Sequence, residues 1–195
     1  MMNTKKSDSS VRNVFLIGFM GCGKSTIAAE LSKSLNRPVL EMDEEIERRE
    51  GMSIPEIFST HGEAYFRHAE TVLLKEVSLQ GGFLVSCGGG VVMRPENVTE
   101  MKKNGIVILL TALPETILSR VADDENRPLL KGRKNVSAIS ELILQRKPAY
   151  EAAANYTVST DQQSAAQIAA NIMAILEKEN AAFSADPMQT PCTKE

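Results

Sequence analysis

The chain has 195 residues, of which 43% are hydrophobic and 24% are charged. This length and composition predict one ordinary globular domain with a core of its own. The formal charge of -3 argues against a nucleic-acid-binding protein, which needs a clustered basic surface, but it leaves room for arginines that hold a small anion. No apolar run approaches the length of about 18 residues that a membrane span needs, and the spacing of Cys22, Cys87 and Cys192 fits no metal site. We therefore expect a cytoplasmic protein with reduced thiols, no membrane partner, and a monomer as the default.

Short β-rich runs alternate with helical segments along the chain. Strands are expected at residues 13–17, 38–41, 83–86, 106–110 and 155–159. Helices are expected at residues 24–35, 43–50, 54–60, 63–79, 95–103, 114–121, 136–151 and 164–179. Strands separated by helices imply βαβ units, and hence a parallel sheet covered on both faces. We predict a doubly wound five-stranded α/β domain at residues 11–179, between a disordered N-terminus at 1–10 and a flexible C-terminal tail at 180–195.

Local signals support several of the expected helix starts. Ser53 and Glu56 have the spacing of a capping box, in which each side chain satisfies a backbone N–H of the first turn. Pro95 and Pro114 suit the first turn of a helix, where a missing N–H breaks no hydrogen bond. These residues predict where their helices begin.

The first expected strand runs into GFMGCGKST, residues 18–26, which fits the phosphate-binding pattern G-x-x-x-x-G-K-[ST]. Its glycines let the backbone fold around an anion with several N–H groups pointing inward, and the following helix adds its positive N-terminal end. The alternative is a glycine turn that carries a lysine by chance, with odds on the order of one in a hundred for such a chain. We predict a nucleoside triphosphate site in which Lys24 reaches the β- and γ-phosphates and Ser25 ligates magnesium.

The second expected strand ends in LEMDEEIERREG, which is rich in carboxylates. If the strand runs through Glu41, then Glu41 and Asp43 alternate onto one face at its carboxyl end, beside the first strand. Carboxylates there could serve magnesium and an acceptor hydroxyl, because strand ends near a phosphate-binding loop commonly bind ligands. The other acidic residues, Glu44, Glu45 and Glu47, are better explained as an ordinary acidic helix start.

The third expected strand lies in LVSCGGGVV, an apolar run that stops at Gly88, Gly89 and Gly90. A flexible turn after a buried strand would explain one glycine better than three. A side chain at Gly89 or Gly90 would stand between the backbone and a ligand lying against it. The triplet therefore predicts half of an acceptor site at this strand end.

Arginines in three other segments are candidate anion ligands: Arg67 in HGEAYFRHAE, Arg127 in ENRPLLKGRKN and Arg146 in LQRKPAY. Any one of them would more often be a solvated surface residue. Residues 123–135 predict a long surface loop, of the kind that often forms a lid, and a lid arginine could stabilise charge on a transferring phosphoryl group. His61 and His68 have no metal-ligand spacing, and neither is assigned to catalysis.

Four blocks of the chain together resemble the shikimate kinase family: GFMGCGKST, MDEEIERREGMSIPEIFSTHGEAYFRHAE, LVSCGGGVV, and NRPLL followed by QRKPAY. The resemblance covers about residues 13–176, which is nearly the whole expected domain. It implies a P-loop fold like that of nucleoside monophosphate kinases, with a mobile lid at about residues 123–135. It also implies transfer of the γ-phosphate of ATP, with Mg²⁺, to the 3-hydroxyl of shikimate in chorismate and aromatic amino acid biosynthesis.

The resemblance further implies roles for individual residues. Asp43 contacts the ring hydroxyls and is the base or orienter for the attacking 3-hydroxyl, and Lys24 and Arg127 act with it in catalysis. Glu41 stands where the family usually has aspartate, and with Ser25 it serves the metal. The implied nucleotide site contains Gly21, Cys22, Gly23, Lys24, Ser25, Thr26, Arg120 (packed on the adenine), Arg127 and, as an adenine neighbour, Gln163. The implied substrate site contains Asp43, Arg67, Gly88, Gly89, Gly90 and Arg146.

Two alternatives remain open at this point. The resemblance implies that Arg67 and Arg146 hold the substrate carboxylate. Another small-metabolite kinase of the same architecture, such as a gluconate kinase, would explain this pair of arginines and the triple glycine less well. A P-loop protein that binds nucleotide and a partner without transfer is the other alternative, although nothing that the chemistry requires is missing.

Overall fold

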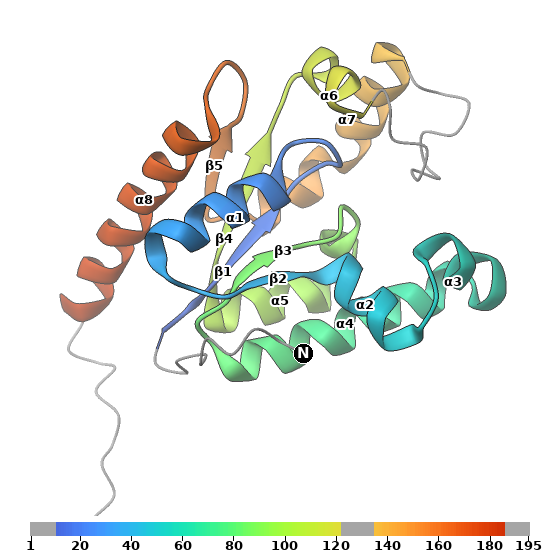
Figure 1. Cartoon of the computed structure of the whole chain (residues 1–195), viewed down its shortest axis with the longest axis horizontal. Helices are drawn as coiled ribbons and strands as arrows, with labels where there is room; N and C mark the ends of the chain where they lie inside the picture. The colour runs from blue at the N-terminus through green and yellow to red at the C-terminus, as the bar shows by residue number, and fades with distance from the viewer. Residues whose placement is uncertain (1–10, 122–134, 186–195) are drawn as a thin grey trace, which may run out of the picture.

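The computed structural model describes residues 11–121 and 135–185 (Figure 1). The described strands form one five-stranded sheet with the order β2-β3-β1-β4-β5, and every pairing is parallel. They are β1 (Asn13–Ile17), β2 (Val39–Glu41), β3 (Leu84–Ser86), β4 (Gly105–Thr111) and β5 (Tyr156–Ser159). The predicted doubly wound α/β fold is confirmed.

Helices fill the connections between the strands. They are α1 (Lys24–Leu35), α2 (Met42–Glu50), α3 (Ile54–His61), α4 (Glu63–Gln80), the 3₁₀ turn η1 (Val91–Met93), α5 (Pro95–Asn104), α6 (Pro114–Val121), α7 (Val136–Ala153) and α8 (Ala165–Ala185). Ser53 and Glu56 form the expected capping box at α3, and Pro95 and Pro114 are the first residues of α5 and α6. The local start signals are therefore confirmed.

The core lies in two layers, one on each face of the sheet, because successive residues of a strand point to opposite faces. Val14 and Leu16 of β1 face the layer that contains α1 and α8, whereas Phe15 and Ile17 face the layer that contains α4 and α5. Figure 1 shows these helix pairs on either side of the sheet. All four side chains are at most 1% exposed, so β1 is the buried central strand that its apolar run predicts.

The position of β2 differs from the expectation. β3 lies between β2 and β1, with Ser86 level with both Leu16 and Glu41, so the prediction that β2 lies beside β1 was wrong. The physical reason is that the crossover through α1 leaves one strand position open, and the later β3 fills it with hydrogen bonds to both neighbours. The sheet therefore presents the phosphate-binding loop, the triple glycine and the start of α2 along one carboxyl edge.

The C-terminal boundary also differs. The sequence placed the end of the last helix at Glu179 and a flexible tail from residue 180, but α8 continues to Ala185. Residues such as Ala181 have high helix propensity, so the helix continues although the sequence there lacks a sustained apolar period. In the described ranges, no helix has the length and apolarity needed to cross a membrane.

Candidate active site

The phosphate-binding loop follows β1 directly and depends on its glycines. Gly18, Gly21 and Gly23 have φ values of 139°, 75° and 99°, a region that L side chains rarely adopt. A Cβ atom at Gly18 would also lie 2.3 Å from the Leu110 carbonyl oxygen, and one at Gly21 would lie 2.7 Å from Cγ1 of Val121. The loop is therefore packed against β4 and α6, which fixes it at the N-terminus of α1.

Lys24 folds back over this loop. Its Nζ donates hydrogen bonds to the carbonyl oxygens of Gly18 at 2.9 Å and Phe19 at 3.1 Å. The ammonium group is thus held against the loop, next to the N–H groups at the positive end of α1. This geometry fits the predicted contact with a bound phosphate.

The residues predicted to serve magnesium lie together. Ser25 Oγ donates to Glu41 Oε2 at 3.0 Å and lies 3.4 Å from Ser86 Oγ at the end of β3. Burial raises the pKa of Glu41, although the hydrogen bonds from the two serines oppose that shift. Hydroxyl and carboxylate oxygens are ligands that Mg²⁺ accepts, and a desolvated carboxylate gains stability from a nearby cation. The residues present therefore fit a magnesium ion.

Glu41 and Asp43 point to different parts of the site, contrary to the expectation of one shared strand face. β2 ends at Glu41, and Asp43 already belongs to the first turn of α2. The helical turn carries Asp43 toward the glycine triplet, where a Cβ at Gly88 would lie 2.8 Å from Asp43 Oδ1. Glu41 accordingly faces the phosphate side, and Asp43 faces the acceptor side.

The glycine triplet lets charged side chains lie directly on the backbone. A Cβ at Gly88 would lie 2.6 Å from Glu70 Oε1, and one at Gly90 would lie 2.5 Å from Arg67 Nη1. Real Cβ atoms do not make contacts this short, so a side chain at either position would displace the charged group. This explains the glycines at positions 88 and 90, whereas a Cβ at Gly89 would make only ordinary contacts, none closer than 3.7 Å.

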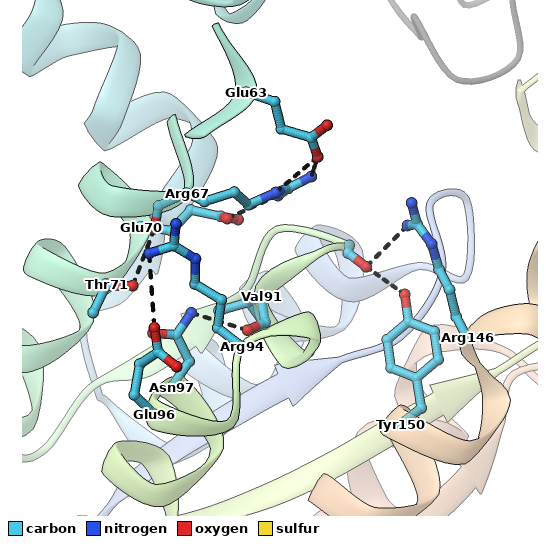
Figure 2. Close-up of polar contacts among 11 residues, drawn as sticks. Glu63, Arg67, Glu70, Thr71, Val91, Arg94, Glu96, Asn97, Arg146 and Tyr150 are labelled. Carbon is cyan, nitrogen blue, oxygen red and sulfur yellow. Dashed lines mark hydrogen bonds and ion pairs between the residues drawn. The ribbon is translucent and has the colours of Figure 1, made fainter. Parts of the chain in front are cut away.

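Arg67 is held between two carboxylates of α4 (Figure 2). Its Nη1 donates to Glu70 Oε2 at 2.8 Å, and its Nε and Nη2 donate to Glu63 Oε1 at 3.2 Å and 3.0 Å. The Arg67 side chain is 15% exposed and that of Glu70 is fully buried, whereas Glu63 is 64% exposed. The guanidinium is therefore anchored from inside and open to exchange partners on its outer side.

Glu70 is a further residue of the site, which the sequence prediction did not include. Burial raises its pKa, the Arg67 charge opposes that shift, and its Oε1 has no hydrogen-bond partner among the described residues. The available signal was its spacing, because a carboxylate three residues after an arginine on a helix lies beside it. Glu70 positions Arg67 and lines the same turn as Asp43.

A second arginine reaches the triplet from α7. Arg146 Nη1 donates to the Gly89 carbonyl oxygen at 3.2 Å, and the hydroxyl of Tyr150 donates to the same oxygen at 2.5 Å. Figure 2 shows Arg67 and Arg146 approaching the glycine turn from α4 and α7. Two guanidinium groups beside one turn are suited to a carboxylate ligand.

Arg120 links three segments on the nucleotide side. Its Nη1 donates to the Gly21 carbonyl oxygen at 3.3 Å and to Thr160 Oγ1 at 3.0 Å, and its Nη2 donates to the Thr160 carbonyl oxygen at 3.0 Å. Gln163 instead bonds within its own neighbourhood, to the Ser159 carbonyl oxygen and to Asn171. Arg120 thus lies beside the phosphate-binding loop, and the adenine contacts implied for Arg120 and Gln163 stay predictions.

Comparison with known proteins decides the family. The family model for shikimate kinase matches residues 20–177. A curated shikimate kinase from Dehalococcoides mccartyi is 41% identical over 160 residues, covering 82% of this chain and 90% of its own. The chain belongs to the shikimate kinase family. Another relative in this family, from Desulforudis audaxviator, is 43% identical over 169 residues, covering 86% of this chain and 88% of its own.

Solved structures agree with this membership. Shikimate kinase from Acinetobacter baumannii in complex with shikimate has a TM-score of 0.82 and 36% identity, covering 88% of this chain and 96% of that one. A gluconokinase from Sinorhizobium meliloti has a TM-score of 0.54 and 15% identity over 90% of this chain and 98% of its own, which shows a shared fold alone. The chain is thus an ATP-dependent kinase of the shikimate kinase family, as the four blocks predicted.

Most residues expected from the family resemblance come together at the carboxyl edge of the sheet. The gathered residues are Gly21, Cys22, Gly23, Lys24, Ser25, Thr26, Glu41, Asp43, Arg67, Gly88, Gly89, Gly90, Arg120 and Arg146. Arg127 and nearly all of the expected lid at residues 123–135 lie outside the described residues. The roles of the individual side chains are proposals.

Proposed function

We propose that this member of the shikimate kinase family transfers the γ-phosphate of ATP to the 3-hydroxyl of shikimate, giving shikimate 3-phosphate and ADP. The supporting observation is the convergence of two arginines, Asp43 and the glycine triplet directly beside the phosphate-binding loop. An ideal Cβ at Gly89 would lie 3.7 Å from the Gly18 carbonyl oxygen, so the two loops are neighbours. A donor phosphate and an acceptor hydroxyl bound at these loops would meet.

On the donor side, the N–H groups of residues 21–26 and the Lys24 ammonium bind the phosphates. Ser25 and Glu41 hold magnesium, which neutralises charge on the phosphate oxygens when it is bound. Arg120 packs on the adenine, with Gln163 as a further neighbour. Arg127 contributes positive charge to the transferring group from the lid.

On the acceptor side, Arg67 and Arg146 hold the carboxylate of shikimate. Each charge-assisted hydrogen bond of this kind contributes about 1.5–3 kcal/mol. Asp43 binds the ring hydroxyls and orients the 3-hydroxyl for attack, accepting its proton late, because the transition state of phosphoryl transfer is loose. The glycine triplet, Gly89 above all, lets the substrate lie against the backbone.

A coupled ADP-release assay across several hydroxyacids tests this function. We expect turnover with shikimate and none with gluconate, because gluconate is an open chain that the two-arginine turn does not orient. Turnover with gluconate and not with shikimate would refute the proposal. Absence of ADP release with every acceptor would favour a P-loop protein that binds without transfer. Lys24→Ala serves as the control for contaminating kinases, since it removes the ammonium that lies against the phosphate-binding loop and that we propose to contact the phosphates.

The setting of the activity is also proposed. We expect a cytoplasmic monomer that binds neither nucleic acid nor membranes. Cell fractionation and light scattering measure these two properties. Recovery in a membrane fraction, or a dimer mass at micromolar concentration, would contradict them.

A further inference from the structure

We infer that Tyr150 is a positioning residue of the acceptor site, which holds the Gly89 carbonyl and thereby releases Arg146 to bind the substrate carboxylate. The inference rests on the proposed function and extends it to a residue outside the expected site. It begins from the shared hydrogen-bond acceptor of the two α7 side chains.

The sequence spacing explains why both side chains reach the same atom. Arg146 and Tyr150 are four residues apart on α7, so they lie on one face of the helix, one turn apart. Both donate to the Gly89 carbonyl oxygen, at 3.2 Å from Arg146 Nη1 and 2.5 Å from the Tyr150 hydroxyl. The arginine contact is at the long end of the usual range, and the tyrosine contact is short. Tyr150 therefore holds this carbonyl more firmly than Arg146 does.

Tyr150 is more deeply buried than Arg146, so the two side chains differ in how freely they can move. Tyr150 is 4% exposed and belongs to the core layer that also contains Val91 and Val92, just after the triplet. Arg146 is half-buried, and its Cζ lies 6.0 Å from the centre of the Phe19 ring in the phosphate-binding loop. A packed aromatic ring is fixed in place, whereas a partly exposed guanidinium on a flexible stem can change partners. Only Arg146 is free to move toward a ligand.

The ionisation of Tyr150 suits this role. Burial raises its pKa to about 12, although the neighbouring Arg146 charge opposes the shift. The hydroxyl consequently keeps its proton and remains a donor throughout the neutral pH range. The carbonyl of Gly89 thus has a permanent donor that substrate binding does not remove.

Tyr150 and Arg146 therefore have different roles at the Gly89 carbonyl. When Arg146 turns to a substrate carboxylate, the carbonyl stays paired with Tyr150, and the peptide plane between Gly89 and Gly90 keeps its orientation. Without the tyrosine hydroxyl, Arg146 would have to break the remaining described hydrogen bond of this carbonyl before it could bind substrate. Tyr150 acts through Arg146 and Gly89 and is not itself a catalytic residue.

Tyr150→Phe tests the inference, because it removes the hydroxyl and keeps the ring in the core. We expect the KM for shikimate to rise about fivefold to tenfold, as one hydrogen bond worth about 1 kcal/mol predicts, with the KM for ATP unchanged. Tyr156→Phe is the matched control. Tyr156 lies on the edge strand β5, and its hydroxyl donates a hydrogen bond to Glu179 of α8. That control should leave both KM values unchanged.

A double-mutant cycle with Arg146→Ala separates positioning from a general structural effect. If Tyr150 acts by releasing Arg146, then adding Tyr150→Phe to Arg146→Ala will raise the shikimate KM no further. The inference is overturned if Tyr150→Phe leaves the shikimate KM unchanged, raises both KM values equally, or adds its full factor in the Arg146→Ala background. Failure of the proposed function is distinct, because the wild-type protein would then release no ADP with shikimate.

Discussion

At the scale of single residues, Arg67 is central to the proposed acceptor site. Removing it by Arg67→Ala should weaken shikimate binding by about 2–5 kcal/mol, because a buried charged contact is lost, with little change in nucleotide affinity. Titration calorimetry with each ligand measures this difference.

Lys24→Ala should instead cause a large fall in kcat, because it removes the ammonium that we propose to contact the phosphates. Equal losses for shikimate and ATP in Arg67→Ala, or an unaltered kcat in Lys24→Ala, would contradict the assignment.

Arg67→Ala has a side effect that a second variant controls. It leaves the fully buried carboxylate of Glu70 without its ion-pair partner, which destabilises the fold. Arg67→Lys keeps a positive charge beside Glu70 but lacks the planar fork that matches a carboxylate. It should therefore fold more stably than Arg67→Ala and still bind shikimate weakly.

Gly90 offers an independent test of the same guanidinium. Its φ of -107° suits any residue, but an alanine Cβ there would lie 2.5–2.7 Å from the Nη1, Cζ and Nη2 atoms of Arg67. Gly90→Ala should displace the guanidinium and raise the Kd for shikimate about tenfold or more, as the loss of one charged hydrogen bond predicts. Gly51→Ala is the control, because a Cβ at that position has nothing within 4 Å, although its φ of 65° costs stability. A normal shikimate Kd in Gly90→Ala would show that Arg67 adjusts without loss.

At the scale of elements, local signals set the boundaries and long-range pairing sets the neighbours. Helices α1 and α6 begin and end where the sequence predicts, because glycine and proline mark their starts. The adjacency of β2 and β3 was not predictable in this way, since periodicity reports which face is buried and not which strand is next. Glu41 and Asp43 separate because α2 begins at Met42, one residue before its expected start, so the alternation of the strand does not continue to Asp43. The phosphate-binding loop was predictable because its glycines have positive φ values, whereas the glycines at 88 and 90 leave room for charged side chains from α2 and α4 that the sequence does not place there.

Asn13 shows how the elements are tied together at the opposite edge of the sheet. The side chain is fully buried; its Nδ2 donates to the Val77 carbonyl oxygen of α4 at 3.1 Å, and its Oδ1 accepts from the Phe83 N–H before β3 at 2.8 Å. Asn13→Ala would leave that N–H unpaired, while the Val77 oxygen keeps the N–H of Gly81 at 3.4 Å. We expect the free energy of unfolding to fall by about 1–3 kcal/mol, with the kcat of the folded protein unchanged.

Urea unfolding measures this change, and Asn171→Ala provides the control. Asn171 is exposed on α8, where its Nδ2 bonds Gln163 Oε1, so the same truncation should change the free energy of unfolding by no more than about 0.5 kcal/mol. If both variants unfold at the same urea concentration, the buried asparagine does not join these elements energetically.

At the scale of the whole molecule, the site contains carboxyl groups at positions where burial disfavours their charged form. Glu41 and Glu70 both have raised pKa values because burial disfavours their charged forms. Glu45 of α2 is 8% exposed, but hydrogen bonds from Arg48 and Arg49 lower its pKa to about 2. The Glu45 carboxylate, paired with two arginines, thus stabilises the folded state at neutral pH, whereas the charged forms of Glu41 and Glu70 oppose it. Such a balance is expected where function requires buried charge.

The variant Glu41→Gln measures how the charge of Glu41 affects the free energy of unfolding. A carboxyl group whose pKa is raised by folding favours the folded state while it is protonated, and that contribution is lost as pH rises through the folded pKa. At pH 8 the glutamine variant should therefore resist urea better than the wild type, because it keeps an oxygen for Ser25 without the buried charge. Near pH 3.5, where Glu41 is protonated in both states, the advantage should disappear. Turnover should fall at every pH, since the amide is a poorer magnesium ligand. If the variant is less stable than the wild type at pH 8, then the charged Glu41 carboxylate stabilises the folded state. The expectation that Glu41 serves the metal at a cost in stability would then be wrong.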